Sequence, residues 1–211
     1  MACLNYADIT IRHHFFQPLR ELNNPEWTAA LVALTALVKH KPNYKDAEEL
    51  RKQAFRGSLN LVRIPAGEFV YDVGNQRIRL PEFAISYSAI TFDQFQAFVK
   101  ATGYSAAPGG AGSGPVNTVS WDDAQAFCAW AGVALPTEQQ WVRAALALDE
   151  QGQRRLDVGR IYWEWCANAH ESGGKALRHW EADGSGVGGV SRDGSYQGYR
   201  LDNLGFRVVA P

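Results

Sequence analysis

The first fifth of the chain carries apolar residues at helical spacing. In "NNPEWTAALVALTALVKHK" they fall at i, i+4, i+7 and i+11, as Trp27, Leu31, Leu34 and Val38. Asn24 and Pro25 suit the first positions of a helix, and Pro42 would stop it. A shorter helix is expected in "YKDAEELRKQAF", ending at Gly57. We therefore expect an N-terminal helical segment over residues 1–57.

Beyond Gly57 the pattern becomes that of short strands. The stretch "LNLVRIPAGEFVYDV" contains two β-rich runs that are broken at the turn signal "PAG". The stretch "QRIRLPEFAISYS" supplies alternating apolar residues for further strands. This change of period separates the helical segment from a second domain over residues 58–211.

Three helices are expected inside the second domain, because each start carries a capping signal. Thr91 with Gln94 and Thr137 with Gln140 have the spacing of a capping box, and Ser120 is a third N-cap. The helix dipole favours the acidic residues that follow Ser120, which are Asp122 and Asp123. The first two helices should end at Gly103 and Gly132. On the third helix the side chains that should face inward are Trp141, Ala144, Ala145 and Leu148.

The last quarter of the chain is expected to be mostly loop. "GRIYWEWCANA" is strand-like and strongly aromatic, with Trp163 and Trp165 on one buried side of the strand. From Arg178 onward Gly, Ser and Asp dominate, until "GFRVV" gives the pattern of a closing strand. Strands and helices that are segregated in this way indicate an α+β fold.

Composition narrows the classes of function. The 211 residues are 46% hydrophobic and carry a net charge of −1, which is typical of a globular protein and argues against a nucleic-acid partner. No apolar run approaches the ~18 residues of a membrane span, and no signal-peptide pattern is present, so a cytoplasmic location is expected by default. Cys3, Cys128 and Cys166 form no metal or CxxC spacing, and we expect the last two to be buried thiols.

Five blocks of sequence carry a resemblance to a known family. They are "LVRIPAGEFV", "AISYSAITFDQFQAFV", "PVNTVSWDDAQAFCAWAGVALPTEQQWVRAA", "WEWCANA" and the terminal "GFRVV". These runs resemble the formylglycine-generating-enzyme (sulfatase-modifying factor) family, a branch of the C-type lectin fold, from about Leu59 to Val209. The resemblance implies an α+β C-type lectin fold of the formylglycine-generating-enzyme type, with an N-terminal helical appendage.

The chain departs from the enzymes of this family where their metal chemistry would lie. Oxidase members use two cysteines late in the fold for copper-dependent thiol oxidation, and residues 178–207 contain none. Another branch uses three histidines for iron, and the five histidines of this chain show no matching pattern. The segment that supplies calcium ligands in relatives is also shortened. We therefore expect no catalytic residues, no metal and no cofactor.

The C-terminal segment resembles a different branch of the same fold. Between family-like ends the chain reads "HWEADGSGVGGVSRDGSYQGYR", which the family does not usually contain. The arrangement is similar to the variable proteins of prokaryotic diversity-generating retroelements, which are rewritten at adenine positions. Products of a mutated asparagine codon dominate residues 179–199, and the exceptions are Trp180, Glu181 and Gln197. The resemblance implies a variable region over about residues 162–207.

The candidate ligand-binding residues follow from this mixture of side chains. Tyr and Trp on a rigid scaffold supply contact area, while Ser, Gly and Asp supply adaptable hydrogen bonds. The candidates are Tyr162, Asn168, His179, Trp180, Glu181, Asp183, Arg192, Asp193, Tyr196 and Tyr199. Alternatives stay open, because the aromatic residues could fold onto the body and Arg192 and Asp193 could form a solvated turn. For Glu164 a hydrogen bond to the backbone is favoured over a general acid.

The leading hypothesis is a non-enzymatic protein that displays a diversified C-terminal surface to a ligand. A protein ligand is favoured over a small molecule because the expected surface is broad and aromatic. Two alternatives are a diverged oxidoreductase of the same family and a regulatory or scaffold domain that works through its N-terminal helices. Stoichiometric copper or iron would favour the first alternative, and loss of binding on deletion of residues 1–57 would favour the second.

Overall fold

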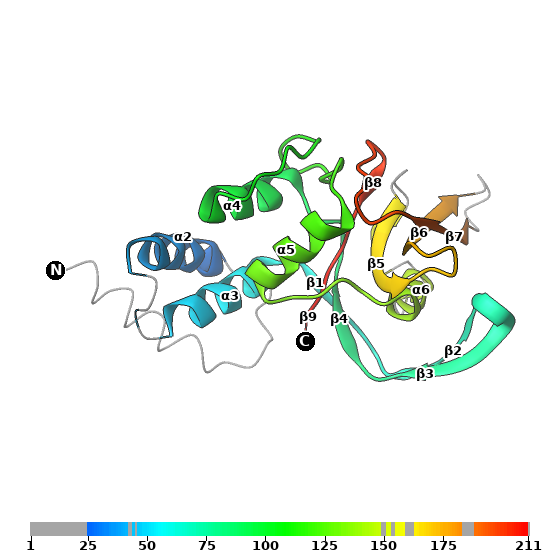
Figure 1. Ribbon diagram of the computed structural model, residues 1–211. Helices are drawn as coiled ribbons and strands as arrows, with labels where there is room; N and C mark the ends of the chain where they lie inside the picture. Colours follow the sequence, from blue (N-terminus) through cyan, green and yellow to red (C-terminus); the bar gives the residue numbers. More distant parts are fainter. Residues whose placement is uncertain are drawn as a thin grey trace. The chain divides into compact units, whose positions relative to one another are not determined.

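The structure is a computed structural model that describes residues 25–41, 44, 46–148, 151–152, 155–158, 163–182 and 188–210 (Figure 1). The chain divides into two compact units, Met1–Asn60 and Leu61–Pro211. The elements, in chain order, are α2 (Pro25–His40), α3 (Ala47–Ser58), β1 (Leu61–Ile64), β2 (Gly67–Tyr71), η1 (Val73–Asn75), β3 (Gln76–Leu80), β4 (Phe83–Ser86), α4 (Phe92–Thr102), α5 (Trp121–Ala131), α6 (Glu138–Ala145), β5 (Trp163–Ala169), β6 (Lys175–Ala182), β7 (Gly188–Ser195), β8 (Leu204–Gly205) and β9 (Val209–Ala210).

The first unit holds the two helices that the apolar spacing predicts. α2 begins at the proline expected in its first position, and α3 runs one residue past Gly57. The two helices pack against each other, with Leu34, Ala54 and Phe55 buried. Three expected features lie outside the described part of the chain, namely Asn24, Pro42 and the side chain of Trp27.

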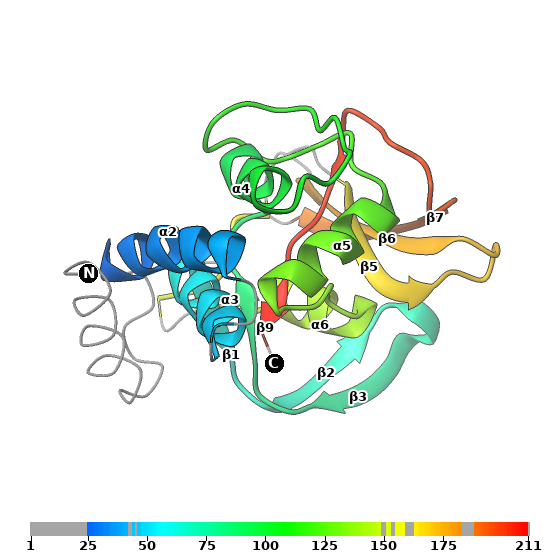
Figure 2. The ribbon, with the colours of Figure 1, turned by 60° about the vertical axis from the view of Figure 1, so that its left-hand side comes forward.

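Strands β1 to β4 form where the alternation predicts them. β1 pairs antiparallel with β4, and β4 pairs with the C-terminal β9, which gives a three-stranded sheet in the order β1-β4-β9. β2 and β3 form a separate antiparallel hairpin, whose β2 strand contacts α6 (Figure 2). The turn η1 between them contains Gly74 at a φ of 73°, a left-handed conformation that favours glycine.

The predicted capping boxes are confirmed. At the start of α4, Thr91 Oγ1 accepts from the Gln94 N–H at 3.2 Å, and Gln94 Oε1 accepts from the Thr91 N–H at 2.9 Å. The predicted pair of Thr137 with Gln140 starts α6 in the same way. At α5 the predicted N-cap Ser120 also forms a reciprocal pair, with Asp123, which was not expected from the sequence. Each box satisfies two backbone N–H groups that the first turn leaves without a helical partner. α4 and α5 end at left-handed glycines, as expected, at Gly103 and Gly132.

Two groups of side chains form the core of the second unit. The first lies around α6 and includes Trp141, Ala144, Ala145, Cys166 and Trp180. The second consists of aromatic rings from α4, α5 and the C-terminal segment, which are Phe95, Phe98, Phe127 and Phe206. The prediction of buried thiols is confirmed at Cys128 and Cys166. The inward position of Leu148 is wrong, because α6 ends at Ala145 and Leu148 is 52% exposed.

The C-terminal region differs most from the prediction. Where a loop is expected after Arg178, β6 and β7 pair antiparallel in a four-stranded sheet of order β7-β6-β5-β8. Gly, Ser and Asp have low strand propensity, but the ladder is formed by backbone groups that these residues also carry. The predicted strand "GFRVV" is split between β8, parallel to β5, and β9, antiparallel to β4 (red in Figure 1). Helices and sheets remain segregated, so the α+β class is confirmed.

Candidate recognition surface

The four-stranded sheet has two unlike faces. Because side chains alternate along a strand, the register of β5, β6 and β7 assigns each residue to one face. The inner face packs into the core around α6 and includes Cys166, Ala176, Trp180 and Val190. The outer face carries Trp163, Trp165, Leu177, His179, Glu181, Ser191 and Asp193. Neighbouring residues in the sequence therefore meet opposite environments.

Solvent reaches only part of the outer face. Trp165 and Leu177 are buried, and Trp165 Nε1 donates to the carbonyl oxygen of Val119, just before α5. Farther along the strands, the rings of Trp163 and His179 are half-buried and lie 5.3 Å apart between centroids. The side chains of Glu181 and Asp193 are exposed, and Ser191 is half-buried. The accessible part thus combines rings, hydroxyl and carboxylate groups.

Two tyrosines stand in the turn that follows β7. The side chains of Tyr196 and Tyr199 are 65% and 58% exposed, and their rings meet edge to face at 5.8 Å. The backbone N–H of Tyr199 donates to the carbonyl oxygen of Tyr196 at 3.0 Å, which closes the turn. These tyrosines and the accessible outer-face residues form the candidate recognition surface: Trp163, His179, Glu181, Ser191, Asp193, Tyr196 and Tyr199.

The tyrosine turn is fastened to the start of α5. The backbone N–H of Trp121 donates to the carbonyl oxygen of Gln197, and that of Thr118 donates to Leu201, both at 2.9 Å. Between these points the Arg200 guanidinium donates to both carboxylate oxygens of Asp123, at 2.9 and 3.0 Å. Three attachments over five residues fix the backbone of the turn that carries the two exposed rings.

Asp123 joins this turn to the helix that supports it. Its carboxylate caps α5 through the Ser120 backbone N–H at 2.8 Å, and it accepts from the Tyr104 hydroxyl at 3.1 Å. Burial opposes ionisation of Asp123, but the hydrogen bonds from Arg200 and Ser120 outweigh it and lower the pKa of Asp123. The carboxylate is therefore ionised at neutral pH and attracts Arg200 to the helix start.

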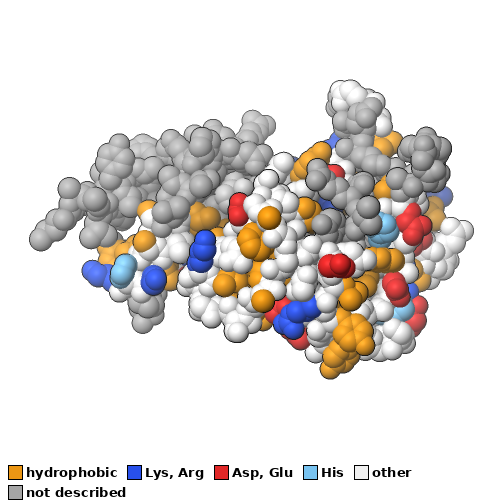
Figure 3. Space-filling view, turned by 90° about the horizontal axis from the view of Figure 1, so that it is seen from above, with side chains coloured by type: hydrophobic (Ala, Val, Ile, Leu, Met, Phe, Trp, Pro, Cys, Tyr) orange, Lys and Arg blue, Asp and Glu red, His pale blue; other side chains and the backbone are white. Residues whose placement is uncertain are grey.

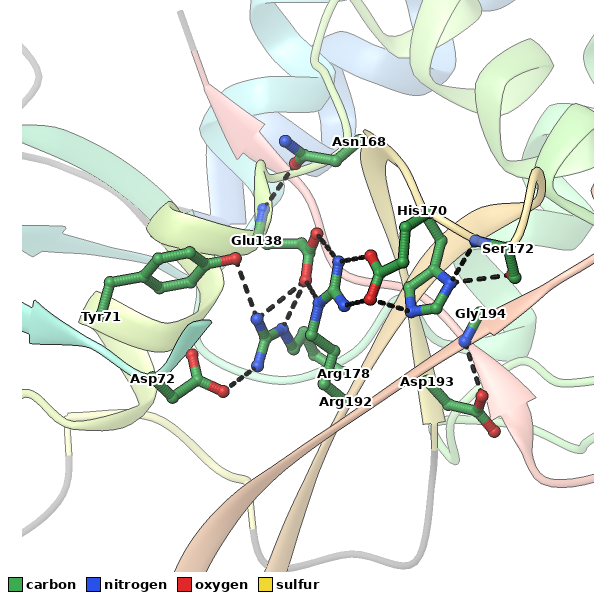
Figure 4. Close-up of polar contacts among 11 residues, drawn as sticks. Tyr71, Asp72, Glu138, Asn168, His170, Ser172, Arg178, Arg192, Asp193 and Gly194 are labelled. Atoms are coloured by element: carbon green, nitrogen blue, oxygen red, sulfur yellow. Dashed lines mark hydrogen bonds and ion pairs between the residues drawn. The ribbon is translucent and has the colours of Figure 1, made fainter. Parts of the chain in front are cut away.

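The inner face carries a network of ion pairs, drawn in Figure 4. Arg178 and Arg192 are direct cross-strand neighbours, and both donate to the buried carboxylate of Glu138, at 2.9 and 2.6 Å. Arg178 also pairs with Asp72 and donates to the hydroxyl of Tyr71 at 3.0 Å. The positive charges of Arg178 and Arg192, directly opposite each other, would repel. The negative charge of Glu138 between them compensates this repulsion, so both guanidinium groups can lie on this face.

The same network extends to the protein surface through Arg192. This guanidinium donates to both carboxylate oxygens of Glu171, at 2.6 and 2.7 Å. The hydrogen bonds from Arg192 lower the pKa of Glu171 to about 2. Burial opposes protonation of Arg178, but Asp72 and Glu138 outweigh it and raise the pKa of Arg178. These shifts favour the charged forms of Glu171 and Arg178 in the network.

The turn between β5 and β6 brings a serine, a histidine and a glutamate together. His170 Nδ1 lies 2.8 Å from Ser172 Oγ, and His170 Nε2 lies 3.5 Å from a carboxylate oxygen of Glu171. The backbone N–H of Ser172 donates to the same Nδ1 at 3.2 Å. These contacts arise among three consecutive residues, and Glu171 is already engaged by Arg192, so we assign them to the geometry of the turn.

Glu164 belongs to a second buried pair. Its carboxylate accepts from Arg207 at 2.7 Å and from Trp141 Nε1 at 2.8 Å. The expectation of a lone Glu164 bonded to the backbone is wrong, because its carboxylate pairs with the side chain of Arg207, which the C-terminal segment between β8 and β9 supplies. Glu164 also lines a pocket of about 180 Å³ with Tyr87, Ser88, Ala89, Ser113, Pro115, Asp157 and Val158. Its engaged oxygens make Glu164 a structural group in that pocket.

The structure describes eight of the ten sequence candidates, of which five lie at the candidate recognition surface and three face inward. His179, Glu181, Asp193, Tyr196 and Tyr199 lie on the recognition surface. Trp180 is only 5% exposed and packs in the core, so a direct ligand contact through its side chain is a wrong prediction. Tyr162 and Asp183 lie outside the described residues.

Two further candidates also face inward. Arg192 lies in β7 between Glu138 and Glu171, so the alternative of a solvated turn is wrong, and a ligand contact of Arg192 stays a prediction. Asn168 accepts from the Glu138 backbone N–H at 2.7 Å and so helps to start α6. Sequence analysis missed Trp163 and Ser191 as surface residues, because only the strand register places them beside His179.

Comparisons with known proteins agree with this architecture. A family profile described as "Sulfatase-modifying factor enzyme 1-like domain" matches residues 46–183. The chain belongs to this family. The match confirms the resemblance that the five sequence blocks carry, and it begins inside the N-terminal helical segment.

The relatives that resemble this chain include proteins named as enzymes and proteins named as inactive. The formylglycine-generating enzyme of Thermomonospora curvata is 28% identical over 156 residues, which cover 46% of this chain and 50% of that enzyme. The "Inactive C-alpha-formylglycine-generating enzyme 2" of Bos taurus is 53% identical over 45 residues, or 18% of this chain and 15% of that protein. The chain thus spans half the length of these relatives or less. "Treponema denticola variable protein 1" shares the fold, with a TM-score of 0.50 and 17% identity over 71% of this chain and 94% of that chain.

The residues of this chain do not fit the copper chemistry of the oxidase members. The sequence holds no cysteine after Cys166, so the late pair of thiolates is missing. Burial raises the pKa of both Cys128 and Cys166, which disfavours the thiolate that a soft metal needs. Within the described residues, no three His, Cys, Asp or Glu side chains are placed to hold a metal ion. The described helices are also too short or too polar to cross a membrane.

Proposed function

We propose that this protein is a non-enzymatic binding protein, which displays the recognition surface to a protein ligand. The observation that carries the proposal is the exposed pair Tyr196 and Tyr199 on a turn with three fixed points on the scaffold. Large rings that are immobilised before binding lose little entropy when a partner covers them. Tyrosine is also among the residues that most often dominate the energy of protein interfaces.

The alternation of faces supports a surface whose chemistry is free to change. Inner-face residues of β6 and β7 hold the core and the ion pairs, whereas Glu181, Ser191 and Asp193 have no role in the core. Substituting such residues costs a folded scaffold little. The family-like ends of the C-terminal segment would then keep the fold while the outer positions vary, as in the variable proteins of diversity-generating retroelements.

The alternative of an oxidoreductase is disfavoured by the chemistry of the thiols. Cys128 and Cys166 are both buried, and they lie in separate elements, α5 and β5. A relative that carries the word "inactive" in its name indicates that members of the family exist without the activity. A metal analysis tests this point directly: stoichiometric copper or iron in the purified protein, together with a rapidly titrating thiol, would favour the enzyme.

Panning of a phage-displayed library of random 12-residue peptides tests the binding function. We expect the wild-type protein to enrich peptides whose binding is weakened about tenfold or more in the Tyr196→Ala/Tyr199→Ala variant. A matched control, Tyr87→Ala/Leu148→Ala, removes two other exposed side chains and should retain binding. Peptides that bind all three proteins equally, or no enrichment at all, would contradict the proposal.

The diversification hypothesis has a separate test in the neighbouring DNA. We expect a near-identical copy of the last hundred or so bases beside a reverse-transcriptase gene, with differences at adenines. The structure adds a finer expectation: codons that differ should encode outer-face and turn positions such as 179, 191, 193, 196 and 199. Differences that fall equally on the inner-face positions 176, 178 and 180 would contradict the assignment of faces.

A further inference from the structure

Within the described residues, the lysine and arginine side chains of β6, of β7 and of the segment that follows β7 are engaged within the protein. Lys175 Nζ lies 3.9 Å from the centroid of the Trp121 ring, which is the geometry of a cation–π contact. The four arginines of the C-terminal segment each form an ion pair: Arg178 with Glu138 and Asp72, Arg192 with Glu138 and Glu171, Arg200 with Asp123, and Arg207 with Glu164. These cations are therefore not available to a partner.

Three carboxylates of the same region are left without such a partner. Glu181, Asp193 and Asp202 are exposed, and within the described residues no Lys, Arg or His lies in ion-pair range of any of them. Asp193 accepts only from the backbone N–H of Gly194, at 2.7 Å. The region thus pairs its positive charges internally and presents negative charge to solvent.

Glu181 and Asp193 lie on the outer face, and Tyr196, Tyr199 and Asp202 lie in the exposed segment that follows β7. Glu181 pairs in register with Gly189 and Asp193 with Leu177, so both carboxylates point from the outer face and lie about 13 Å apart along the strands. Tyr196 follows Asp193 by three residues, and Asp202 follows Tyr199 by three. At the right of Figure 3, acidic side chains lie among hydrophobic, histidine and basic ones. A partner that covers the tyrosines also meets these carboxylates.

We propose that the recognition surface takes a basic peptide segment, rich in arginine or lysine, of a protein partner; this rests on the proposed binding function. Guanidinium groups stack on tyrosine rings and also pair with carboxylates. Arginine side chains of a partner can therefore contact both the tyrosines and the acidic residues of this surface. An acidic segment or a nucleic-acid phosphate would place like charges together, which is unfavourable by electrostatic complementarity.

The test uses the peptides that the wild-type protein enriches from the random 12-residue library. Their mean net charge is compared with that of the unselected library, and their affinities are measured by fluorescence anisotropy at low and high salt. The decisive variant is Glu181→Gln/Asp193→Asn/Asp202→Asn. The matched control, Glu68→Gln/Glu82→Gln/Asp93→Asn, removes the same charge from exposed positions elsewhere in the second unit. Thermal unfolding confirms that each variant is folded.

We expect the enriched peptides to be basic, and to bind about tenfold more weakly to the decisive variant but normally to the control. Their affinity should also fall as salt rises. Enriched peptides that are neutral or acidic, but still require Tyr196 and Tyr199, would overturn this inference and leave the binding function intact. Peptides that do not depend on the tyrosines, or none at all, would overturn both.

Discussion

The two faces of the β6–β7 hairpin place adjacent residues in very different environments. On β6, Arg178 is fully buried and contacts Glu138, Asp72 and Tyr71. Glu181, three residues on, is exposed and has no ion-pair partner among the described residues. On β7, Arg192 faces Glu138 while its neighbour Asp193 faces solvent. Side-chain alternation alone separates the two roles, because the backbone ladder is the same for both.

This contrast teaches that a supporting face and an exposed face need not occupy separate segments. The inner face ties the hairpin to α6 and to the β2–β3 connection through Glu138 and Asp72. Along the accessible part of the strands, the side chains of the outer face do not pack in the core around α6. A stretch of Gly, Ser and Asp can thus be rigid in its backbone and unconstrained in half of its side chains.

The largest expected effect comes from Trp180, the candidate that turned out to face inward. Trp180→Ala should lower the free energy of unfolding by about 3–5 kcal/mol, because it leaves a large cavity in the core. Tyr199→Ala, the matched change at an exposed ring, should lower it by less than about 0.5 kcal/mol. Urea denaturation measures both values, and equal losses would remove the distinction between the faces.

A subtler comparison uses two glycines of the same strand. A Cβ added at Gly194 would clash with the His170 ring on the inner face, whereas at Gly189 on the outer face it meets open space. Gly194→Ala should therefore destabilise by about 1–3 kcal/mol and Gly189→Ala by less than about 0.5 kcal/mol. The pair is compared by urea denaturation. A neutral Gly194→Ala would show that this turn is less closely packed than the structure indicates.

The ion pair at the edge of the inner face predicts a pH-dependent effect. Arg192 lowers the pKa of Glu171 to about 2 in the folded protein, against an ordinary value of 4.5. A depressed pKa contributes stability that is present above the unfolded value and is lost as the pH falls from about 5 toward 2. The stability difference between wild type and Arg192→Gln should therefore shrink over this window. NMR titration of the Glu171 carboxyl should show its pKa returning toward 4.5 in the variant.

The smallest effect on folding is expected from the free carboxylates. Glu181→Gln, Asp193→Asn and Asp202→Asn should each change the free energy of unfolding by less than about 0.5 kcal/mol, since none has an ion-pair partner to lose. Thermal unfolding scans of the three single variants check this. A clear loss in any of them would mean that the outer face carries structural contacts after all.

Sequence analysis was most successful where structure is local. The three capping pairs join residues only three apart, and the left-handed glycines follow directly from where each helix must end. The alternation that marks β1 to β4 is likewise a pattern within single strands. Of the candidate site residues, the tyrosines and the outer-face residues were found because their composition is unusual for the family, and not because their faces were known.

The sequence by itself determined the starts of α4, α5 and α6, the ends of α4 and α5, the α+β class and the family, since these depend on neighbouring residues and on blocks that keep their order. Only the tertiary structure decided that the Gly-rich segment is a hairpin, that Trp180 and Arg192 face inward, and that Glu164 meets Arg207. The physical reason is distance along the chain: Arg192 and Glu138 are 54 residues apart, and Arg207 and Glu164 are 43 apart. Such pairings are selected by packing and register, and no local pattern of side chains encodes them.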